Sequence, residues 1–290
     1  MVCSCQIATE RLCALLILVY GDESFDETTE RICALSGIMG TETQWAELER
    51  RWVRRNEGRP FHAKNCESDW GLFQNPGDSE NHKKNQELYK DLTILLANSG
   101  LFGYSAVLDL VAARKYFPAA VDLAYYRCFW HVLDAVQEAA AHVGDIAKFT
   151  FASRVESDFN ALTLYGNLRN SLPGWKESLA DELSSIKADE NPRVQVGDLL
   201  ARESMKAIDN ILGPVKRPPR KSWETLKNTG RFFIEPFSEG YFEASAAARD
   251  AKIERFSQGT RDYTEWLEKK GRHHSHTNLL VFMGTRKHSL

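Results

Sequence analysis

Long apolar runs are missing from this chain of 290 residues. The run near the N-terminus, LCALLILVY at residues 12–20, is about half the length of the roughly 20 residues that a membrane-spanning helix needs. It ends in Gly-Asp-Glu without a small-x-small cleavage site, so it does not fit a secretory signal peptide. We therefore expect a cytoplasmic protein with no membrane partner, in which this run forms a buried strand.

Cysteine is scarce, with six residues in the whole chain. The pair Cys3 and Cys5 has no second pair at the spacing of zinc ligands, which argues against a zinc knuckle. Cys33 and Cys128 lie in apolar stretches and are expected to behave as small core residues. With no sign of a disulfide framework, the sequence favours a reducing compartment.

Net charge is also small, at −3, so bulk charge indicates no partner. Its distribution is uneven: residues 214–290 carry a charge of +6 and residues 1–213 a charge of −9. An acidic body beside a basic tail fits a protein that binds metal with acids and phosphate with bases. It also fits a solvated helical face, and charge alone favours that interpretation.

Hydrophobic periodicity predicts an α/β protein, namely a mixed β-sheet flanked by helices with a helical C-terminal extension. Thr41 and Gln44 form a capping-box pattern at the start of the first helix. The strands are expected at 15–20, 31–40, 101–110, 148–153 and 182–187, and the helices at 41–59, 82–98, 118–142, 158–171 and 195–212. The predicted domain is 1–213, followed by a basic linker and helices, at 241–256 and 261–270, within 214–290.

Asp22 and Glu23 follow the first predicted strand in the stretch LVYGDESFDE, residues 18–27. Acids at the end of a strand indicate either a hairpin turn or a site in which the strand positions a carboxylate over a cleft. The long segment 61–81 has no period and is predicted to be a loop, which at this length is more often functional than not.

Asp22, Glu156 and Asp198 belong to three separate predicted elements and form a candidate metal site. Carboxylates that converge repel one another unless a cation neutralises them, and hard oxygen ligands suit Mg²⁺ or Mn²⁺. Two such ions hydrolyse phosphodiesters in many enzymes. For Asp198, spacing alone slightly favours a surface pair with Arg202, four residues later on the same helix.

The motifs YGDES, FHAKNCES and VQVGDLLARE occur in this order, with AYYRCFWHVL between the last two. The ordered set, with RKSWETL at 220–226, resembles the domain of unknown function 3800 family, which is assigned to the ribonuclease H-like superfamily. The resemblance covers residues 14–230 and implies a ribonuclease H-like sheet with a carboxylate-bound centre of Mg²⁺ or Mn²⁺. It departs from the family at three places, which are Gly197, Asn65 and Ala152-Ser153.

Carried over residue by residue, the resemblance assigns Asp22 as the bridging ligand on the central strand, with Glu23 beside it. Asp198 is the ligand on the last core helix and Glu156 a third ligand. His62 orients water or contacts phosphate. The supporting residues are Glu67, Gln195, which would support Asp198, and Glu203, which is expected to pair elsewhere.

The predicted function is metal-dependent hydrolysis of DNA or RNA. The candidate contacts to the nucleic-acid backbone are Lys64, Lys216, Arg217, Arg220 and Lys221. The alternative is a non-catalytic ribonuclease H-like binding or scaffold protein of a mobile-element or phage-defence system. An aspartyl-phosphate phosphatase is rejected, because Ser24 stands where that chemistry usually needs a second Asp.

Overall fold

The computed structural model describes residues 16–74, 77–118, 124–153, 158–251 and 254. The chain divides into two compact units, Met1–Glu239 and Gly240–Leu290. The described part of the second unit is helical at 240–251 and at 254, within the helix predicted at 241–256 and its immediate flank. The helix predicted at 261–270 lies outside the described residues.

The first unit contains a six-stranded sheet in the order β5-β4-β1-β2-β3-β6. β1 pairs antiparallel with β2, and β2 antiparallel with β3, whereas β4 runs parallel to β1, β5 parallel to β4, and β6 parallel to β3. The sheet is therefore mixed, as predicted. The strands are β1 Leu16–Phe25, β2 Ile32–Gly40, β3 Phe102–Asp109, β4 Ile146–Ala152, β5 Ser184–Ile186 and β6 Phe232–Phe237.

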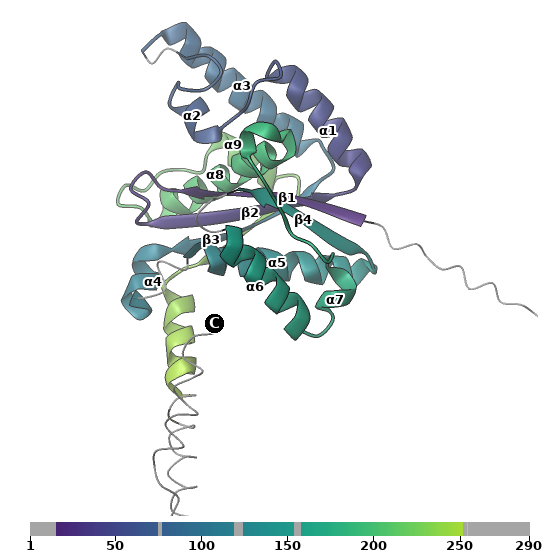
Figure 1. Cartoon of the computed structure of the whole chain (residues 1–290). Helices are drawn as coiled ribbons and strands as arrows, with labels where there is room; N and C mark the ends of the chain where they lie inside the picture. Colours follow the sequence, from purple (N-terminus) through teal and green to yellow (C-terminus); the bar gives the residue numbers. More distant parts are fainter. Residues whose placement is uncertain (1–15, 75–76, 119–123, 154–157, 252–253, 255–290) are drawn as a thin grey trace, which may run out of the picture. The chain divides into compact units, whose positions relative to one another are not determined.

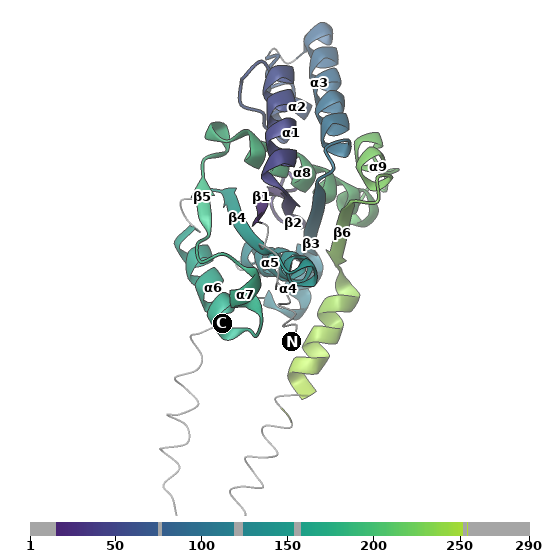
Figure 2. The same cartoon turned by 90° about the vertical axis from the view of Figure 1, so that its right-hand side faces the viewer.

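Helices cover both faces of this sheet (Figures 1 and 2). One face carries α1 Glu42–Arg55, α2 Ala63–Glu67, α3 Ser79–Ala97, α8 Pro192–Leu212 and α9 Lys221–Lys227. The opposite face carries α4 Leu110–Tyr116, α5 Ala124–Val143, α6 Asp158–Ser171 and α7 Trp175–Ser178. A short 3-10 turn, Ala188–Glu190, precedes α8. None of the helices in the described ranges is long and apolar enough to span a membrane.

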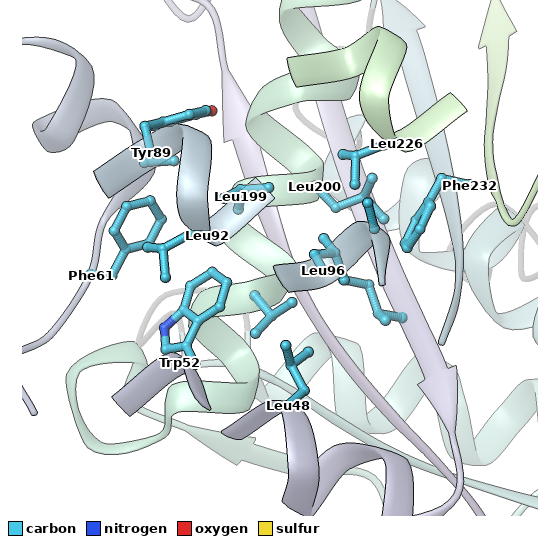
Figure 3. Packing of buried hydrophobic residues seen from close by; sticks show 14 of the residues in the cluster. Leu48, Trp52, Phe61, Tyr89, Leu92, Leu96, Leu199, Leu200, Leu226 and Phe232 are labelled. Atoms are coloured by element: carbon cyan, nitrogen blue, oxygen red, sulfur yellow. The ribbon is translucent and has the colours of Figure 1, made fainter. Parts of the chain in front are cut away.

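The larger core lies between the sheet and the layer of α1, α3 and α8 (Figure 3). Leu199 and Leu200 of α8 are fully buried there, and burying one such side chain stabilises a fold by about 1.5–3 kcal/mol. The capping box of Thr41 and Gln44 is present at the start of α1, as predicted. The residues labelled in Figure 3 are Leu48, Trp52, Phe61, Tyr89, Leu92, Leu96, Leu199, Leu200, Leu226 and Phe232.

The expectation that the first strand ends at Tyr20 was wrong, because β1 continues through the acidic residues to Phe25. Asp22 is paired with Ser36 of β2, so it lies inside the ladder and not in a turn. The turn starts one residue after the strand, at Asp26, whose carboxylate accepts hydrogen bonds from the N–H groups of Arg31 and Ile32. Burial alone would raise the pKa of Asp26, but these hydrogen bonds outweigh it and lower the pKa to about 2.

Other differences concern short elements without a strong period. The segment predicted as a loop at 61–81 contains α2 and the first turn of α3. α4, α9 and the edge strand β6 were not predicted. Because β6 pairs with β3, the sheet continues beyond residue 213, where the sequence placed a domain boundary.

Candidate functional site

The backbones of β1 and α8 approach each other closely beside Asp22. A Cβ atom at Gly197 of α8 would lie 3.0 Å from the backbone nitrogen of Asp22 and 3.0 Å from the Cα of Gly21. The absence of a side chain at Gly197 therefore lets the helix lie directly against the central strand. This contact brings the residue after Gly197, which is Asp198, close to Asp22.

Replacing Gly197 by alanine is expected to destabilise the fold by about 1–3 kcal/mol, because the added methyl group has backbone on the other side of the contact. The matched control is Gly166→Ala in α6, where a Cβ meets nothing within 4 Å. That control should gain about 0.5–1 kcal/mol from helix propensity. Urea unfolding of both variants tests the contact, and equal stabilisation of the two would contradict it.

The carboxyl group of Asp22 has a pKa well above its ordinary value. Burial is the main cause, and the negative charges of Glu23 and Asp198 add to it. The N–H of Glu23 donates a hydrogen bond to Oδ1 of Asp22 at 2.8 Å, which lowers the pKa in part. Asp22 thus lies beside two other acids, Glu23 and Asp198, whose charges disfavour its ionised form, and we call these three residues the acid group.

Asp198 is only 5% exposed, and burial raises its pKa. Three features of its surroundings lower the pKa of Asp198 in part. Nδ1 of His62 lies 3.4 Å from Oδ2, the N–H of Ala63 donates to the same oxygen at 2.7 Å, and Arg202 lies nearby. The other oxygen, Oδ1, has no hydrogen-bond partner among the residues that the structure describes, so it is the atom that remains for a ligand.

The loop that contacts Asp198 is held by a second residue of α8. Oε1 of Gln195 accepts a hydrogen bond from the N–H of Phe61 at 3.1 Å, while its Nε2 donates to the carbonyl of Ala188 at 3.0 Å. Gln195 therefore positions the same loop that carries His62 and Ala63. The His62 side chain is 56% exposed, so its ring is accessible from solvent beside the acid group.

Glu67 and Glu203 belong to a separate buried network. Arg202 donates from Nε to Oε2 of Glu67 at 2.7 Å, and Arg220 forms ion pairs with both Glu67 and Glu203. Glu203 is 0% exposed and also accepts hydrogen bonds from the hydroxyls of Tyr89 and Ser222, each at 2.6 Å. The side chain of Arg202 is thus directed to Glu67 and not to a surface pair with Asp198.

The basic residues predicted to contact nucleic acid occupy different environments. Lys64 and Lys216 are exposed, and Nζ of Lys216 donates to the carbonyl of Ile211. Arg217 and Lys221 line a groove beside α3 and α8. Arg220 is held in the buried network with Glu67 and Glu203, so its charge is already neutralised.

Glu156, the third predicted metal ligand, lies outside the described residues. Beyond β4 the next described acid is Asp158, whose Oδ2 accepts hydrogen bonds from the hydroxyls of Ser153 and Ser185 at 2.6 and 2.9 Å. Sequence reasoning did not single out Asp158, Tyr89 or Lys206. Asp158 lies near the strand end where an acid was sought, and its contact with Ser185 joins segments 27 residues apart in the sequence.

The candidate metal donors near Asp22 are carboxylate oxygens. Within the described residues, no group of three or more His, Cys, Asp or Glu side chains is arranged to hold a metal ion. Asp22 and Asp198 supply oxygen donors of the kind that Mg²⁺ and Mn²⁺ prefer. Burial raises the pKa values of both groups, the charges of Glu23 and Asp198 add to the shift of Asp22, and a cation would favour the ionised forms. The chemistry of these two donors therefore fits a hard divalent ion.

Comparison of the chain with protein-family models found no match, and comparison with curated proteins found none either. The family that the ordered motifs resemble therefore stays a prediction.

Proposed function

We propose that the chain is a ribonuclease H-like, metal-dependent nuclease that hydrolyses phosphodiester bonds of DNA or RNA. The observation that carries the proposal is the proximity of Asp22 and Asp198, on β1 and α8, with both pKa values raised and with Glu23 beside them. Like charges held together in this way are costly unless a cation neutralises them.

Three features support the ribonuclease H-like assignment within this proposal. β1 lies inside the sheet and carries Asp22. The last long helix of the unit, α8, carries Asp198. The sheet is mixed and is covered by helices on both faces. A carboxylate on a central strand and another on the last core helix are what the sequence resemblance implies for such a centre.

Two bound Mg²⁺ or Mn²⁺ ions would supply an activated water and stabilise the leaving oxygen of a phosphodiester. Asp22 and Asp198 are the residues that would hold them. In the chain itself, Gln195 and the N–H of Ala63 fix the loop that presents His62 beside Asp198. His62 would orient water or contact a phosphate oxygen, because its ring is more than half exposed beside Asp198.

The test is incubation of the purified protein with labelled single-stranded, duplex and hybrid DNA and RNA, in Mn²⁺, Mg²⁺ or EDTA. We expect cleavage that requires the metal and that falls at least about 100-fold in Asp22→Asn and in Asp198→Asn, since even outer-shell residues of metal sites contribute 10–100-fold. Asp189→Asn, an exposed acid on the 3-10 turn before α8, is the matched control and should cleave normally.

Metal-independent cleavage, or cleavage that persists in both site variants, would contradict the proposal. Absence of cleavage with every substrate, together with no stabilisation by Mn²⁺, would favour the alternative of a non-catalytic binding or scaffold protein.

A further inference from the structure

A groove of about 980 Å³ lies beside the buried network of Glu67 and Glu203. Its walls come from the end of α2, from α3, from the second half of α8, and from α9 with the residues just before it. Five cationic side chains line it, namely Lys90, Lys206, Arg217, Arg220 and Lys221. Glu67 is the one acid among its described lining residues, and Arg202 and Arg220 already neutralise it.

Three of the five cations are available to a ligand. Lys90, Arg217 and Lys221 are exposed, and none of them forms an ion pair within the described residues. Lys206 is only 14% exposed and lies 3.7 Å from the carboxylate of Glu27. Burial and the charge of Arg202 lower the pKa of Lys206, as expected for a lysine placed among other cations. The groove therefore carries uncompensated positive charge.

The groove and the acid group are joined by one ridge of α8. Asp198, Arg202, Lys206 and Asn210 follow one another at intervals of four residues, so this ridge turns by about 40° around the helix at each step. Lys206 and Asn210 line the groove. At a rise of about 1.5 Å per residue, Asp198 and Asn210 are about 18 Å apart along the helix axis. At about 3.4 Å of helix axis per phosphate of one strand, this corresponds to roughly five nucleotides.

The groove offers charge and hydrogen-bond donors but no exposed Phe, Tyr or Trp ring among its described lining residues. Tyr89 is the one Phe, Tyr or Trp among its described lining residues, and it is buried with its hydroxyl bonded to Glu203. The polar lining residues Asn85, Gln86 and Thr225 suit phosphate and sugar oxygens. Recognition of bases in single strands generally needs exposed aromatic rings, so this groove suits the backbone and not the bases.

We propose that this groove binds the sugar-phosphate backbone of a nucleic-acid strand, within about five nucleotides of the acid group and without regard to base sequence. The proposal rests on the proposed nuclease function, because it treats α8 as the path from the groove to the acids. It keeps Arg217 and Lys221 of the sequence prediction and adds Lys90. Lys64 and Lys216 do not line the groove, and Arg220 is held by two carboxylates.

The test compares two triple variants with equal loss of charge. The groove variant is Lys90→Gln, Arg217→Gln and Lys221→Gln. The control is Lys83→Gln, Lys148→Gln and Lys176→Gln, three exposed lysines that do not line the groove. Binding of fluorescent single-stranded DNA, single-stranded RNA and duplexes of about 20 nucleotides is measured by anisotropy in EDTA, over a range of salt concentrations.

We expect the groove variant to bind about tenfold or more weakly, and the slope of log K against log salt to fall by about 2, which is roughly 0.7 for each lost phosphate contact. The control variant should keep the wild-type slope. The substrate that the wild type binds best, single strand or duplex, identifies the form of nucleic acid that the groove accepts.

Equal weakening in both variants, no binding by the wild type, or tighter binding of polyglutamate than of every oligonucleotide would overturn the groove assignment. Because binding is measured without metal, its outcome is separate from that of the cleavage assay. Weakened binding confined to the groove variant would support the groove even if no substrate is cleaved.

Discussion

Replacing Asp22 by asparagine is expected to raise the thermal stability of the metal-free protein at neutral pH and to abolish its stabilisation by Mn²⁺. Desolvation in the fold, and then the charges of Glu23 and Asp198, disfavour the ionised form of the Asp22 carboxyl group, so an uncharged side chain at this position should avoid that cost. In the wild type, a Mn²⁺ concentration of about 100 times Kd should add roughly 2.7 kcal/mol to the free energy of unfolding. For a domain of this size that corresponds to a rise in Tm of about 5–10 °C.

The stability that Asp22 and Asp198 contribute to the metal-free protein should fall as the pH rises. The folded-state pKa values of Asp22 and Asp198 are raised, so their contribution to stability is fully present below the unfolded-state pKa and is lost as the pH rises through the folded-state values. The advantage of Asp22→Asn in EDTA should therefore grow as the pH increases from acid to neutral. Stabilisation by Mn²⁺ should grow in the same direction, because the ion competes with protons for the carboxylates.

Thermal unfolding scans from acid to neutral pH, with Mn²⁺ and with EDTA, measure both effects. The exposed control Asp189→Asn should leave the EDTA stability and the Mn²⁺ shift unchanged. A Mn²⁺ shift in Asp22→Asn equal to that of the wild type would place any metal site elsewhere, and a loss of metal-free stability would mean that Asp22 is held by contacts that asparagine cannot make.

Replacing Arg220 by methionine is expected to cost about 3–5 kcal/mol of folding stability, the cost of removing one partner of a buried ion pair. Glu203 is 0% exposed and, among the described residues, would retain the hydroxyls of Tyr89 and Ser222 as its partners. Glu67 would lose one of its two arginines. The matched control is Arg50→Met, which removes an exposed pair with Glu47 and should cost less than about 1 kcal/mol.

A double variant separates the ion pair from the packing of the arginine stem. Adding Glu203→Gln to Arg220→Met removes the stranded charge, so part of the lost stability should return. The pKa of Glu203 is raised by burial and lowered by Arg220. The loss in Arg220→Met should therefore be largest at neutral pH and should shrink in acid, where Glu203 becomes protonated. Urea unfolding at both pH values measures this, and a loss independent of pH would argue for packing alone.

The strongly periodic elements were predictable from the sequence. α8 was expected at 195–212 and spans Pro192–Leu212, since its apolar arc repeats over several turns. The start of α1 was expected from Thr41 and Gln44, whose capping box depends only on residues three apart. These signals are local, and local hydrogen bonds and one buried face are enough to determine them.

Other features had no local signal of sufficient strength. β6 is an edge strand of six residues and α2 has five residues, so neither shows a measurable period. The extension of β1 through Asp22 and Glu23 was missed because acids disfavour strands, whereas pairing with β2 outweighs that preference. The partners of Glu67 and Glu203 are separated by up to 153 residues, and periodicity carries no information about such contacts.

By itself the sequence determined the mixed α/β class, the main helices and strands, and Asp22 and Asp198 as the acids of interest, because patterning and residue chemistry act within a few neighbouring positions. Only the tertiary structure decided that these two acids come together where Gly197 lies against β1. It also decided that Arg220 forms ion pairs with Glu67 and Glu203. Finally, it placed Lys90 and Lys206 in one groove with Arg217 and Lys221. Each of these depends on the packing of α8 and α3 against distant segments, since burial and charge proximity arise only when the chain has folded.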